Sequence, residues 1–482
     1  MAESLKILLL SAEVAPFAKR GGLGDVAGSL PKALRKLGHD VRVVMPAYRA
    51  IEHGYPGVTP MALQLNVPMG TGQGRAGAFE GQLPGSDVPV YFIAENHLFN
   101  RPEIYGYGDD GYRFAFFSRA ALDLVVAALG WRPDVVHAND WHTAPAITWL
   151  ATTGHGDQRY RDIPTIYTIH NLAHQGKAPW EILEYLGVQS HSLMEEAYGE
   201  VNFMARGIYH ATMINTVSPT YAREIMTTEG GAGLDGLLRH RGFDVHGILN
   251  GLDYEEWDPG TDGRLAARFD AHKRELRREN RRALQERLGL PQTDDGPLVA
   301  MISRLDWQKG LDITGHVIHL LLNDTAGKAQ FVVLGTGEAH YEAMFAQLAN
   351  YHREKMAAVL AYDADLAPLI YAGSDLFLMP SLFEPCGLGQ LIAMRYGSVP
   401  VVRATGGLAD TVENESTGFT FHEHSAEAFW GALSRAIRVY RTEPERWAEI
   451  QKQGMEADYS WERSARGYEQ LFGWAISRIR GY

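Results

Sequence analysis

The stretch Lys6–Gly28 reads KILLLSAEVAPFAKRGGLGDVAG, and it decides the fold. An apolar run, Ile7–Leu10, leads into a glycine-rich turn at Lys19–Asp25, and apolar residues then recur at helical spacing. A continuously apolar run is typical of a parallel strand that is covered on both faces. The stretch therefore predicts the strand–turn–helix unit that opens a doubly wound α/β domain.

The first helix has clear ends and one irregularity. Its apolar residues run from Leu23 to Leu37, and Gly38 suits the position just after a helix. Pro31 interrupts the run, which predicts a kink or a helix in two parts.

The same alternation of short apolar runs and helical patterns continues along the chain and occurs twice. The predicted strands are Lys6–Ala12, Val41–Pro46, Val88–Ile93, Asp134–Ala138, Pro164–Ile169, Met213–Val217, Leu298–Ser303, Gln330–Leu334, Ala357–Ala361, Asp375–Met379 and Val399–Val402. The segment between the two sets is rich in Gly, Asn, Asp and Pro and places a boundary close to Asn250. We expect domains at residues 1–249 and 250–460, followed by a C-terminal helix within 461–482.

Composition narrows the function classes. The 482 residues are 45% hydrophobic and 21% charged, which is typical of a globular protein. Lys and Arg total 45 against 58 Asp and Glu, a net charge of −13, so the chain is a poor candidate for a nucleic-acid binder. Ile7–Leu10 is too short to span a membrane. The single cysteine, Cys386, suits a reducing compartment, and we expect a cytoplasmic protein.

Two doubly wound domains imply a deep cleft, with ligands beyond the carboxyl ends of the strands. Lys19, Gly21 and Gly22 follow the first strand and open a helix, an arrangement that suits an anion such as phosphate. The glycine spacing matches neither a P-loop nor a complete G-x-G-x-x-G. A glycine turn with a solvated lysine is the alternative.

Two further strand ends in the first half carry histidine and aspartate. One reads DVVHANDWHT from Asp134 to Thr143, and the other places His170 after an apolar strand. The cluster around Asp140 favours a site, although each residue could instead be a helix cap or a core histidine. No pair of histidines has the spacing of metal ligands.

The second half repeats this design. Arg304 and Lys309 follow its first strand, where they could clamp a diphosphate. Glu384 ends a later strand and precedes a glycine-opened helix that could hold an anion or sugar hydroxyls. The candidate binding residues of these turns are Cys386, Gly387, Leu388, Thr405 and Gly406, although Cys386 has no base beside it and also suits simple packing.

One acidic pattern is a decoy. Asp363-Ala-Asp365 matches the D-x-D arrangement that binds metal in some enzymes, but a three-residue pattern is weak among 58 acids. We expect Asp365 to cap the helix Leu366–Ala372, and we expect no metal or other cofactor.

Together these motifs resemble the glycogen/starch synthase family of bacteria and plants, over essentially the whole chain. The matching stretches are Lys19–Leu23, His137–Thr143, Thr168–Gly176, Ile248–Asp253, Ser303–Asp312, Phe383–Gln390, Thr405–Thr411 and the tail from Tyr459. The resemblance implies an α/β fold of two Rossmann-like domains facing a deep cleft (GT-B type). Its first domain takes the glucan acceptor, its second takes the nucleotide-sugar donor, and its last helix crosses back to the first.

The resemblance also implies the reaction. Glucose passes from ADP-glucose to the nonreducing end of an α-1,4-glucan, with retention of configuration. Use of UDP-glucose, or a non-catalytic glucan-binding relic, is the alternative reading. Phosphorylases, sugar epimerases and Rossmann dehydrogenases compete on architecture alone. Neither nucleic acid nor membrane is expected as a partner.

Site roles follow by matching position. Lys19, Gly21 and Gly22 would meet the diphosphate from one domain, and Arg304 and Lys309 from the other. Glu384 would hold the glucosyl group and help to orient the two cations. The remaining implied contacts are Asp140 and His170 near the anomeric carbon and C6 hydroxyl, Asn250 on sugar, Tyr362 on adenine, and Asp25 and Tyr105 as weaker members.

Two positions depart from related sequences. Arg20 stands where the signature usually has Thr or Val, which places an extra charge beside the proposed phosphate site. Ile392 stands where related retaining enzymes carry a second glutamate. We therefore expect front-side transfer without a metal, in which the leaving diphosphate deprotonates the acceptor hydroxyl.

Overall fold

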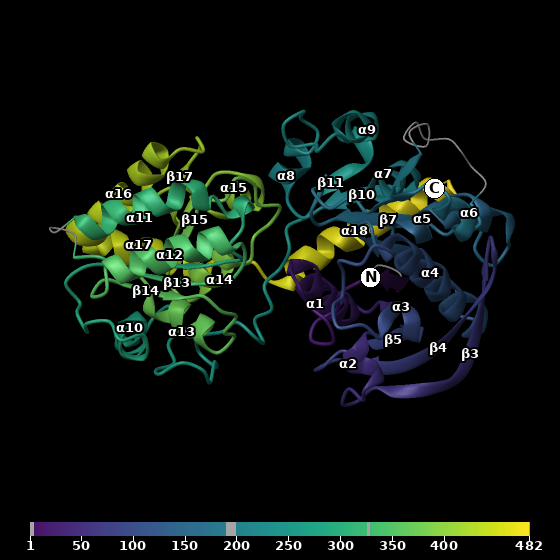
Figure 1. Ribbon diagram of the computed structural model, residues 1–482, viewed down its shortest axis with the longest axis horizontal. Coiled ribbons are helices and arrows are strands. Elements are labelled where there is room, and N and C mark those ends of the chain that lie inside the picture. Colours follow the sequence, from purple (N-terminus) through teal and green to yellow (C-terminus); the bar gives the residue numbers. More distant parts are fainter. Residues whose placement is uncertain (1–3, 189–198, 325–327, 482) are drawn as a thin grey trace. The chain divides into compact units, whose positions relative to one another are not determined.

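A computed structural model describes residues 4–188, 199–324 and 328–481. The chain forms two compact units (Figure 1). The N-terminal unit comprises Met1–Gly251 with Trp461–Tyr482, and the C-terminal unit comprises Leu252–Ser460.

The N-terminal unit is built on a nine-stranded sheet within the described residues, in the order β11-β10-β7-β6-β1-β2-β5-β4-β3. Neighbouring strands are parallel from β11 to β5, and the last two strands pair antiparallel. The strands are β1 (Lys6–Leu10), β2 (Asp40–Pro46), β3 (Thr59–Met69), β4 (Gly72–Gln82), β5 (Pro89–Ala94), β6 (Val135–Asn139), β7 (Thr165–Ile169), β10 (Met213–Thr216) and β11 (Val245–Gly247). A separate pair joins β8 (Lys177–Pro179) to β9 (Glu200–Asn202).

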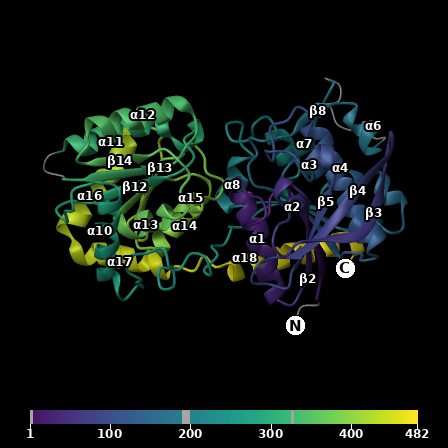
Figure 2. The same ribbon diagram turned by 60° about the horizontal axis from the view of Figure 1, so that its bottom comes forward.

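All six strands predicted for this half occur, with ends within two residues of the expectation. The long hairpin of β3 and β4 was not predicted, and Figure 2 shows it on the edge of the N-terminal unit. Much of its surface is exposed and β4 is rich in glycine and alanine, so it lacks the continuous apolar run of a buried strand.

Helices connect these strands. They are α1 (Gly22–Lys36), α2 (Arg49–Glu52), α3 (Asn96–Phe99), α4 (Asp110–Leu122), α5 (Ala144–Ala151), α6 (Ile182–Leu186), α7 (Phe203–His210), α8 (Pro219–Glu224), α9 (Asp235–His240) and α18 (Trp461–Arg480). A π-helical stretch over Asp123–Ala128 extends α4. Pro31 lies inside α1, which is one helix, so the alternative of two separate helices is wrong. Its buried face, from Leu23 to Leu34, packs on the sheet and holds the helix together across the proline.

The C-terminal helix α18 belongs to the N-terminal unit, as expected from the resemblance. It contacts α1 and also β6, β7 and β10. Tyr468 and Phe472 of α18 are fully buried in the core of this unit. The Tyr468 hydroxyl accepts a hydrogen bond from Asn215 Nδ2 at 3.2 Å, which ties the helix to β10.

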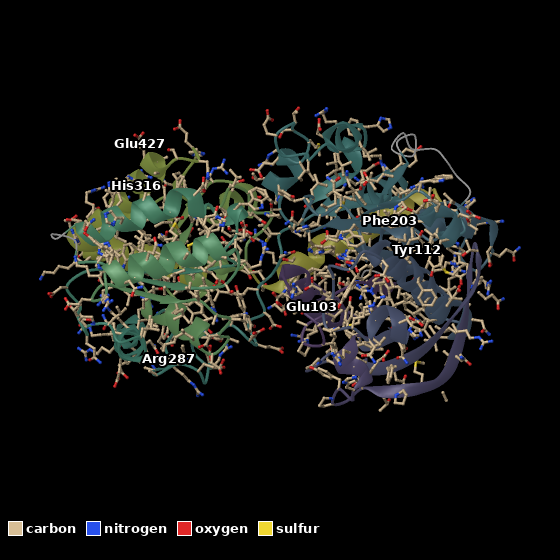
Figure 3. All side chains as sticks on the ribbon, in the orientation of Figure 1. Glu103, Tyr112, Phe203, Arg287, His316 and Glu427 are labelled. Carbon is tan, nitrogen blue, oxygen red and sulfur yellow. The ribbon has the colours of Figure 1, made fainter. Side chains whose placement is uncertain are left out.

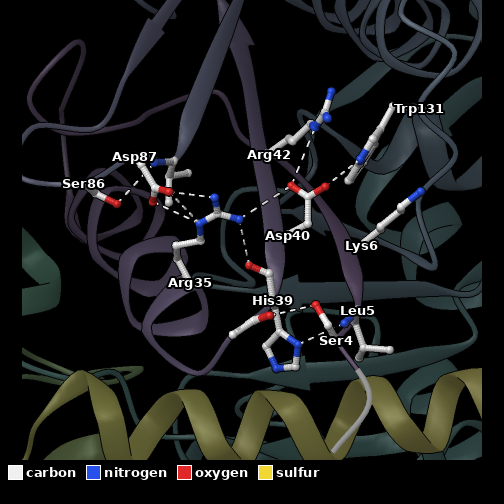
Figure 4. Close-up of polar contacts among 12 residues, drawn as sticks. Ser4, Leu5, Lys6, Arg35, His39, Asp40, Arg42, Ser86, Asp87 and Trp131 are labelled. Atoms are coloured by element: carbon white, nitrogen blue, oxygen red, sulfur yellow. Dashed lines mark hydrogen bonds and ion pairs between the residues drawn. The ribbon is translucent and has the colours of Figure 1, made fainter.

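The segment from α1 to β2 is fastened by the polar contacts that Figure 4 shows. Asp40 at the start of β2 accepts a 2.9 Å hydrogen bond from the Trp131 indole. Arg35 near the end of α1 binds both carboxylate oxygens of Asp87. His39 Nδ1 accepts the Leu5 N–H at 3.2 Å, so the turn after α1 is fixed to the strand before it.

The C-terminal unit contains a six-stranded, wholly parallel sheet within its described residues, in the order β14-β13-β12-β15-β16-β17. The strands are β12 (Leu298–Ile302), β13 (Gln330–Leu334), β14 (Met356–Val359), β15 (Leu376–Met379), β16 (Val399–Arg403) and β17 (Phe419–Phe421). The helices are α10 (Arg277–Arg287), α11 (Leu311–Asn323), α12 (Ala339–Tyr351), α13 (Leu366–Gly373), α14 (Gly389–Arg395), α15 (Gly406–Thr411), α16 (Ala426–Thr442) and α17 (Pro444–Glu456).

Two apolar cores cover the two faces of this second sheet. Alternate residues of β12, such as Val299 and Ala300, enter different cores because successive strand side chains point to opposite faces. One core includes α11 and α16, and the other includes α13 and α14 (Figure 2). Both units are thus doubly wound α/β structures, as predicted.

Among the described helices, none combines the length and apolar character that a membrane crossing requires.

Candidate active site

The glycine turn after β1 precedes α1 directly. Lys19 Nζ lies 2.6 Å from the carboxylate of Asp25, which is in the first turn of α1. A Cβ atom added to Gly21 or Gly22 would meet no described atom within 4 Å, so there is open space beside both glycines. The space agrees with the approach of a ligand to this backbone.

A buried carboxylate that we did not predict, Glu13, occupies the inner side of this turn. Its Oε2 accepts the N–H groups of Arg20 at 2.5 Å and Gly21 at 3.0 Å. Its Oε1 accepts the hydroxyl of Tyr105 in a short hydrogen bond. The Gly21 N–H, expected to point at a diphosphate, therefore donates to a protein carboxylate. The sequence signal that could have identified Glu13 is an acidic residue shortly after a buried strand, the same signal used for Asp140 and Glu384.

Tyr105 lies in a small group of stacked rings. Its ring stacks on His142 at 4.8 Å between centroids, and His142 stacks on Trp141 at 4.1 Å. Burial, reinforced by the Glu13 carboxylate, raises the pKa of Tyr105 far above its usual range. The hydroxyl therefore stays protonated and donates to Glu13.

The ends of β6 and β7 meet through Asp140 and His170. Asp140 Oδ1 accepts the His170 N–H at 2.8 Å. Asn139 Nδ2 donates to the Leu10 carbonyl at 3.0 Å, so its Oδ1 faces His170 Nε2 at 2.9 Å. Because Oδ1 is only an acceptor, Nε2 carries the proton and His170 Nδ1 keeps its lone pair. Asp140 has φ of 55°, a left-handed backbone that aspartate tolerates better than most residues.

Burial sets the charge of this pair. It raises the pKa of Asp140 to about 7, against the opposing effect of N–H donors from His170 and Asn171. Burial also lowers the pKa of His170 to about 3, so the imidazole is neutral at pH 7. A neutral ring with a free lone pair suits acceptance of a hydrogen bond from a sugar hydroxyl.

Two other polar residues of this unit differ in role. His137 is fully buried, with Nε2 2.6 Å from Thr168 Oγ1, and has the core role weighed for it above. Asn250 follows β11 and is 5% exposed, and its Oδ1 has no hydrogen-bond partner among the described residues. A buried unpaired acceptor is costly, so this amide is suited to a ligand hydroxyl.

In the C-terminal unit, Lys309 and Glu384 form a largely buried ion pair. Lys309 Nζ lies 2.7 Å from Glu384 Oε2, with side-chain exposures of 15% and 8%. Ser381 Oγ donates to the same oxygen at 3.0 Å. Lys309 follows β12 and Glu384 follows β15, so two neighbouring strands bring the pair together at their carboxyl ends.

We expected Glu384 to orient both Arg304 and Lys309, but Arg304 contacts a different carboxylate. Its guanidinium lies 2.7 Å from Asp306 Oδ2, and the side chain is 58% exposed. Asp306 also caps the short helix that contains Lys309 by accepting the Gln308 N–H. In this structure, Glu384 contacts Lys309, while Asp306 holds Arg304 near the same strand end.

The glycines of the later turns serve mainly to pack one turn on another. A Cβ atom on Gly406 would collide with the Glu384 carbonyl, and the Gly407 N–H already donates to that carbonyl at 3.0 Å. Gly387, at φ of 75°, and Cys386 both present their carbonyls to the Gln390 amide at 3.0 Å. Cys386 is buried. Leu388 and Thr405 immediately precede α14 and α15.

One prediction around residue 363 is contradicted by the structure. Asp365 does not cap α13: Asp363 Oδ1 instead accepts the N–H groups of Asp365 at 3.1 Å and Leu366 at 2.8 Å. The acid two residues earlier reaches forward to the start of the helix, so the prediction for Asp365 is wrong. Tyr362 is 84% exposed and presents a ring to solvent. Within residues 4–188, 199–324 and 328–481, no three His, Cys, Asp or Glu side chains form a metal-binding group.

Models of known protein families match both units of the chain. Residues 6–240 match the family described as starch synthase catalytic domain, and residues 284–454 match glycosyl transferases group 1. A glycogen synthase of Moorella thermoacetica is 46% identical over 100% of this chain and 99% of its own length. A glycogen synthase of Thermotoga maritima is 43% identical over 98% of this chain and 100% of its own.

Solved structures extend the comparison. The catalytic domain of starch synthase IV from Arabidopsis thaliana, bound to ADP and acarbose, superposes with a TM-score of 0.88 at 36% identity, covering 99% of this chain and 100% of that one. A sucrose-phosphate synthase from Thermosynechococcus elongatus shares the fold at a TM-score of 0.61 and 18% identity, covering 97% and 98%. On this full-length similarity, the chain belongs to the glycogen/starch synthase family of glycosyltransferases.

Proposed function

We propose that this enzyme transfers glucose from ADP-glucose to the nonreducing end of an α-1,4-glucan, with retention of configuration. The observation that carries the proposal is the buried Lys309–Glu384 pair at the carboxyl ends of β12 and β15. A lysine suited to a leaving diphosphate beside a carboxylate suited to sugar hydroxyls supports the proposal. The Arabidopsis relative was solved with ADP and acarbose, which supports an adenine nucleotide donor and a glucan acceptor here.

The C-terminal unit binds the donor in this proposal. Lys309 and Arg304 neutralise the diphosphate as it leaves, and such preorganised donors often contribute about 3–4 kcal/mol each. Glu384 accepts hydrogen bonds from the glucosyl ring while it holds Lys309 in place. Cys386, Gly387, Leu388, Thr405 and Gly406 line the sugar and phosphate through their backbone. The exposed ring of Tyr362 stacks on the adenine.

The N-terminal unit supplies groups for the reacting sugar and the acceptor. Asp140 and His170 lie near the anomeric carbon and the C6 hydroxyl, which His170 contacts through Nδ1. The buried Oδ1 of Asn250 accepts a sugar hydroxyl. Lys19, with the open backbone at Gly22, meets phosphate, while Asp25 and Tyr105 shape the same region.

The chemical step is front-sided. The bond from the anomeric carbon to the diphosphate oxygen breaks, and its electron pair leaves with the nucleotide. The acceptor 4-OH forms the new bond on the same face and gives its proton to the leaving phosphate oxygen. Asp140 supports the oxocarbenium-like transition state when it is ionised, and the cationic side chains stabilise the departing charge.

Donor choice is the first experiment. Purified enzyme is incubated with maltoheptaose and either ADP-glucose or UDP-glucose at equal concentration, and chain lengths are followed by chromatography. We expect elongation with ADP-glucose at a rate at least tenfold higher. A preference for UDP-glucose would identify UDP-glucose as the donor, and no elongation with either would favour a non-catalytic glucan-binding relic.

The single buried cysteine suits a reducing compartment, and we propose the cytoplasm as the location.

A further inference from the structure

Glu13 lies in a loop, yet hydrogen bonds fix both its backbone and its side chain. The residue is 4% exposed and follows β1 by three positions. Ser11 fixes its backbone from both sides, since the Ser11 hydroxyl donates to the Glu13 carbonyl at 2.5 Å and accepts the Glu13 N–H at 3.2 Å. A buried carboxylate with a fixed backbone has few rotamers, so its two oxygens point in defined directions.

Those two oxygens join segments that are distant in sequence. Oε2 binds the two N–H groups at the centre of the glycine turn, and Oε1 binds the Tyr105 hydroxyl, 92 residues away. All three donors approach an ionised acceptor, and such hydrogen bonds are about twice as strong as neutral ones. Gly24 fits closely against this bridge, because a Cβ there would lie 3.3 Å from Oε2 and 3.1 Å from Lys19 Cγ and would crowd both side chains.

A diphosphate cannot take the Gly21 N–H without displacing this carboxylate. Displacement would strip three hydrogen bonds from a buried charge, a cost of the kind that buried groups avoid. The turn therefore reaches its ligand through other groups, and Gly21 contributes by holding its shape.

We propose that Glu13 is a positioning residue that fixes the Lys19–Gly22 turn and the Tyr105 ring relative to each other. The inference rests on the proposed function for its kinetic consequence. Without the Glu13 bridge, the turn and the ring lose their common anchor, and misplacement of a binding group by about 1 Å can lower a rate about 100-fold.

The surface pair beside this bridge supplies a matched control. Arg20 donates to Glu103 at 2.8 Å, and both side chains are more than half exposed. Figure 3 labels Glu103 in the N-terminal unit. Because exposed pairs contribute little, Glu103→Gln should leave transfer unchanged while it alters the charge next to the same turn.

The experiment compares Glu13→Ala with Glu13→Gln. The glutamine Oε1 can accept both backbone N–H groups and its amide can donate to Tyr105, so Gln restores the bridge without its charge. We expect Ala to raise the KM for ADP-glucose at least tenfold, with a smaller fall in kcat, and Gln to return within threefold of the unchanged enzyme. Ala with unaltered kinetics, or Gln as impaired as Ala, would overturn the proposal.

Hydrogen exchange at the amides of Arg20 and Gly21 gives a second readout that needs no catalysis. Protection should be lost in Glu13→Ala and kept in Glu13→Gln and Glu103→Gln, and equal protection in all three contradicts the bridge. If unchanged enzyme transfers no glucose, the proposed function fails while this readout still judges Glu13. If Glu13→Ala does not fold, Tyr105→Phe replaces it, because it removes only the Oε1 arm of the bridge: a KM for ADP-glucose at least threefold higher is expected, and an unaltered KM overturns the proposal.

Discussion

Lys309 Nζ lies 2.7 Å from Glu384 Oε2, although the two residues are 75 positions apart. The pair is largely buried, and Ser381 completes the coordination of the carboxylate oxygen. A buried ion pair is weak evidence for stability, since desolvation offsets much of its attraction. Its placement at two adjacent strand ends is better explained by function.

The first prediction concerns this pair. Lys309→Ala should lower kcat about 100- to 1000-fold, because it removes a charge that we propose to stabilise the departing diphosphate. It should also destabilise the C-terminal unit, because Glu384 is left buried without its cation. Steady-state kinetics with ADP-glucose and chemical denaturation measure the two effects.

Lys328→Ala is the matched control for that variant. Lys328 forms an exposed pair with Asp295 at 2.8 Å, so its loss should change neither quantity appreciably. Unchanged turnover in a folded Lys309→Ala enzyme would show that Lys309 does not act on the diphosphate.

The second prediction concerns metal dependence. Since Arg304 and Lys309 are proposed to neutralise the leaving group, transfer should continue at an undiminished rate in excess chelator. The test is elongation of maltoheptaose after dialysis against EDTA, with and without added Mg²⁺ or Mn²⁺. Loss of activity on chelation, restored by a divalent cation, would sink the metal-independent mechanism.

The third prediction concerns Asp140. Burial raises its pKa to about 7, so the native state binds this proton more tightly than the unfolded chain. The associated stability is present below about pH 4 and is lost as pH rises towards 7. Asp140→Asn keeps a residue that tolerates the left-handed backbone and abolishes this titration.

The measurement for Asp140 is unfolding free energy against pH. The stability of Asp140→Asn relative to the unchanged enzyme should rise by about 1.4 kcal/mol per pH unit between pH 5 and 7. Parallel curves for the two proteins would mean that Asp140 is not a buried titrating group.

The fourth prediction has the opposite sign and concerns His137. Burial, with a smaller effect of nearby His170, lowers the pKa of His137 to about 3. The unfolded chain takes up a proton near pH 6.5 that the native state refuses, so stability falls as pH decreases below 6.5. His137→Gln should remove about 1.4 kcal/mol of the loss between pH 7.5 and 5.5.

Exposed His53 provides the comparison for His137. His53→Gln controls for the loss of a histidine at an exposed position. If both variants follow the curve of the unchanged enzyme, protonation of His137 does not contribute to acid destabilisation.

Much of the fold was predictable because its sheets are parallel and buried. Ile7–Leu10 and Val299–Ile302 are continuously apolar, and such runs announce strands without any knowledge of their partners. The β3–β4 hairpin was not predictable in this way: Thr59–Met69 is largely exposed and Gly72–Gln82 has few β-branched or aromatic residues. Its strands are stabilised by pairing and packing that local sequence does not report.

The positions of the candidate site residues were predictable to the extent that polar side chains follow strand ends. Asp140, His170, Lys309 and Glu384 all lie there, and the structure brings each pair within hydrogen-bond distance. Glu13 was missed because its partners include Tyr105, a contact that depends on tertiary structure.

The excess of glycine, 51 residues in all, has two causes, which differ in what surrounds each glycine. Gly21 and Gly22 border open space, which suits the phosphate contact proposed for this turn. Gly406 and Gly335 instead lie against the carbonyls of Glu384 and Ser303, where no side chain fits. Close packing between turns thus explains part of a composition that ligand binding alone does not.

The central claim is tested most directly by transfer of labelled glucose from ADP-[¹⁴C]glucose to glycogen, followed by digestion with an α-1,4-specific exo-hydrolase. The account predicts that label enters the polymer and is released completely by the hydrolase, since each glucose joins a nonreducing end with the α configuration. Label that stays in the donor, appears as free glucose, or resists the hydrolase would contradict it.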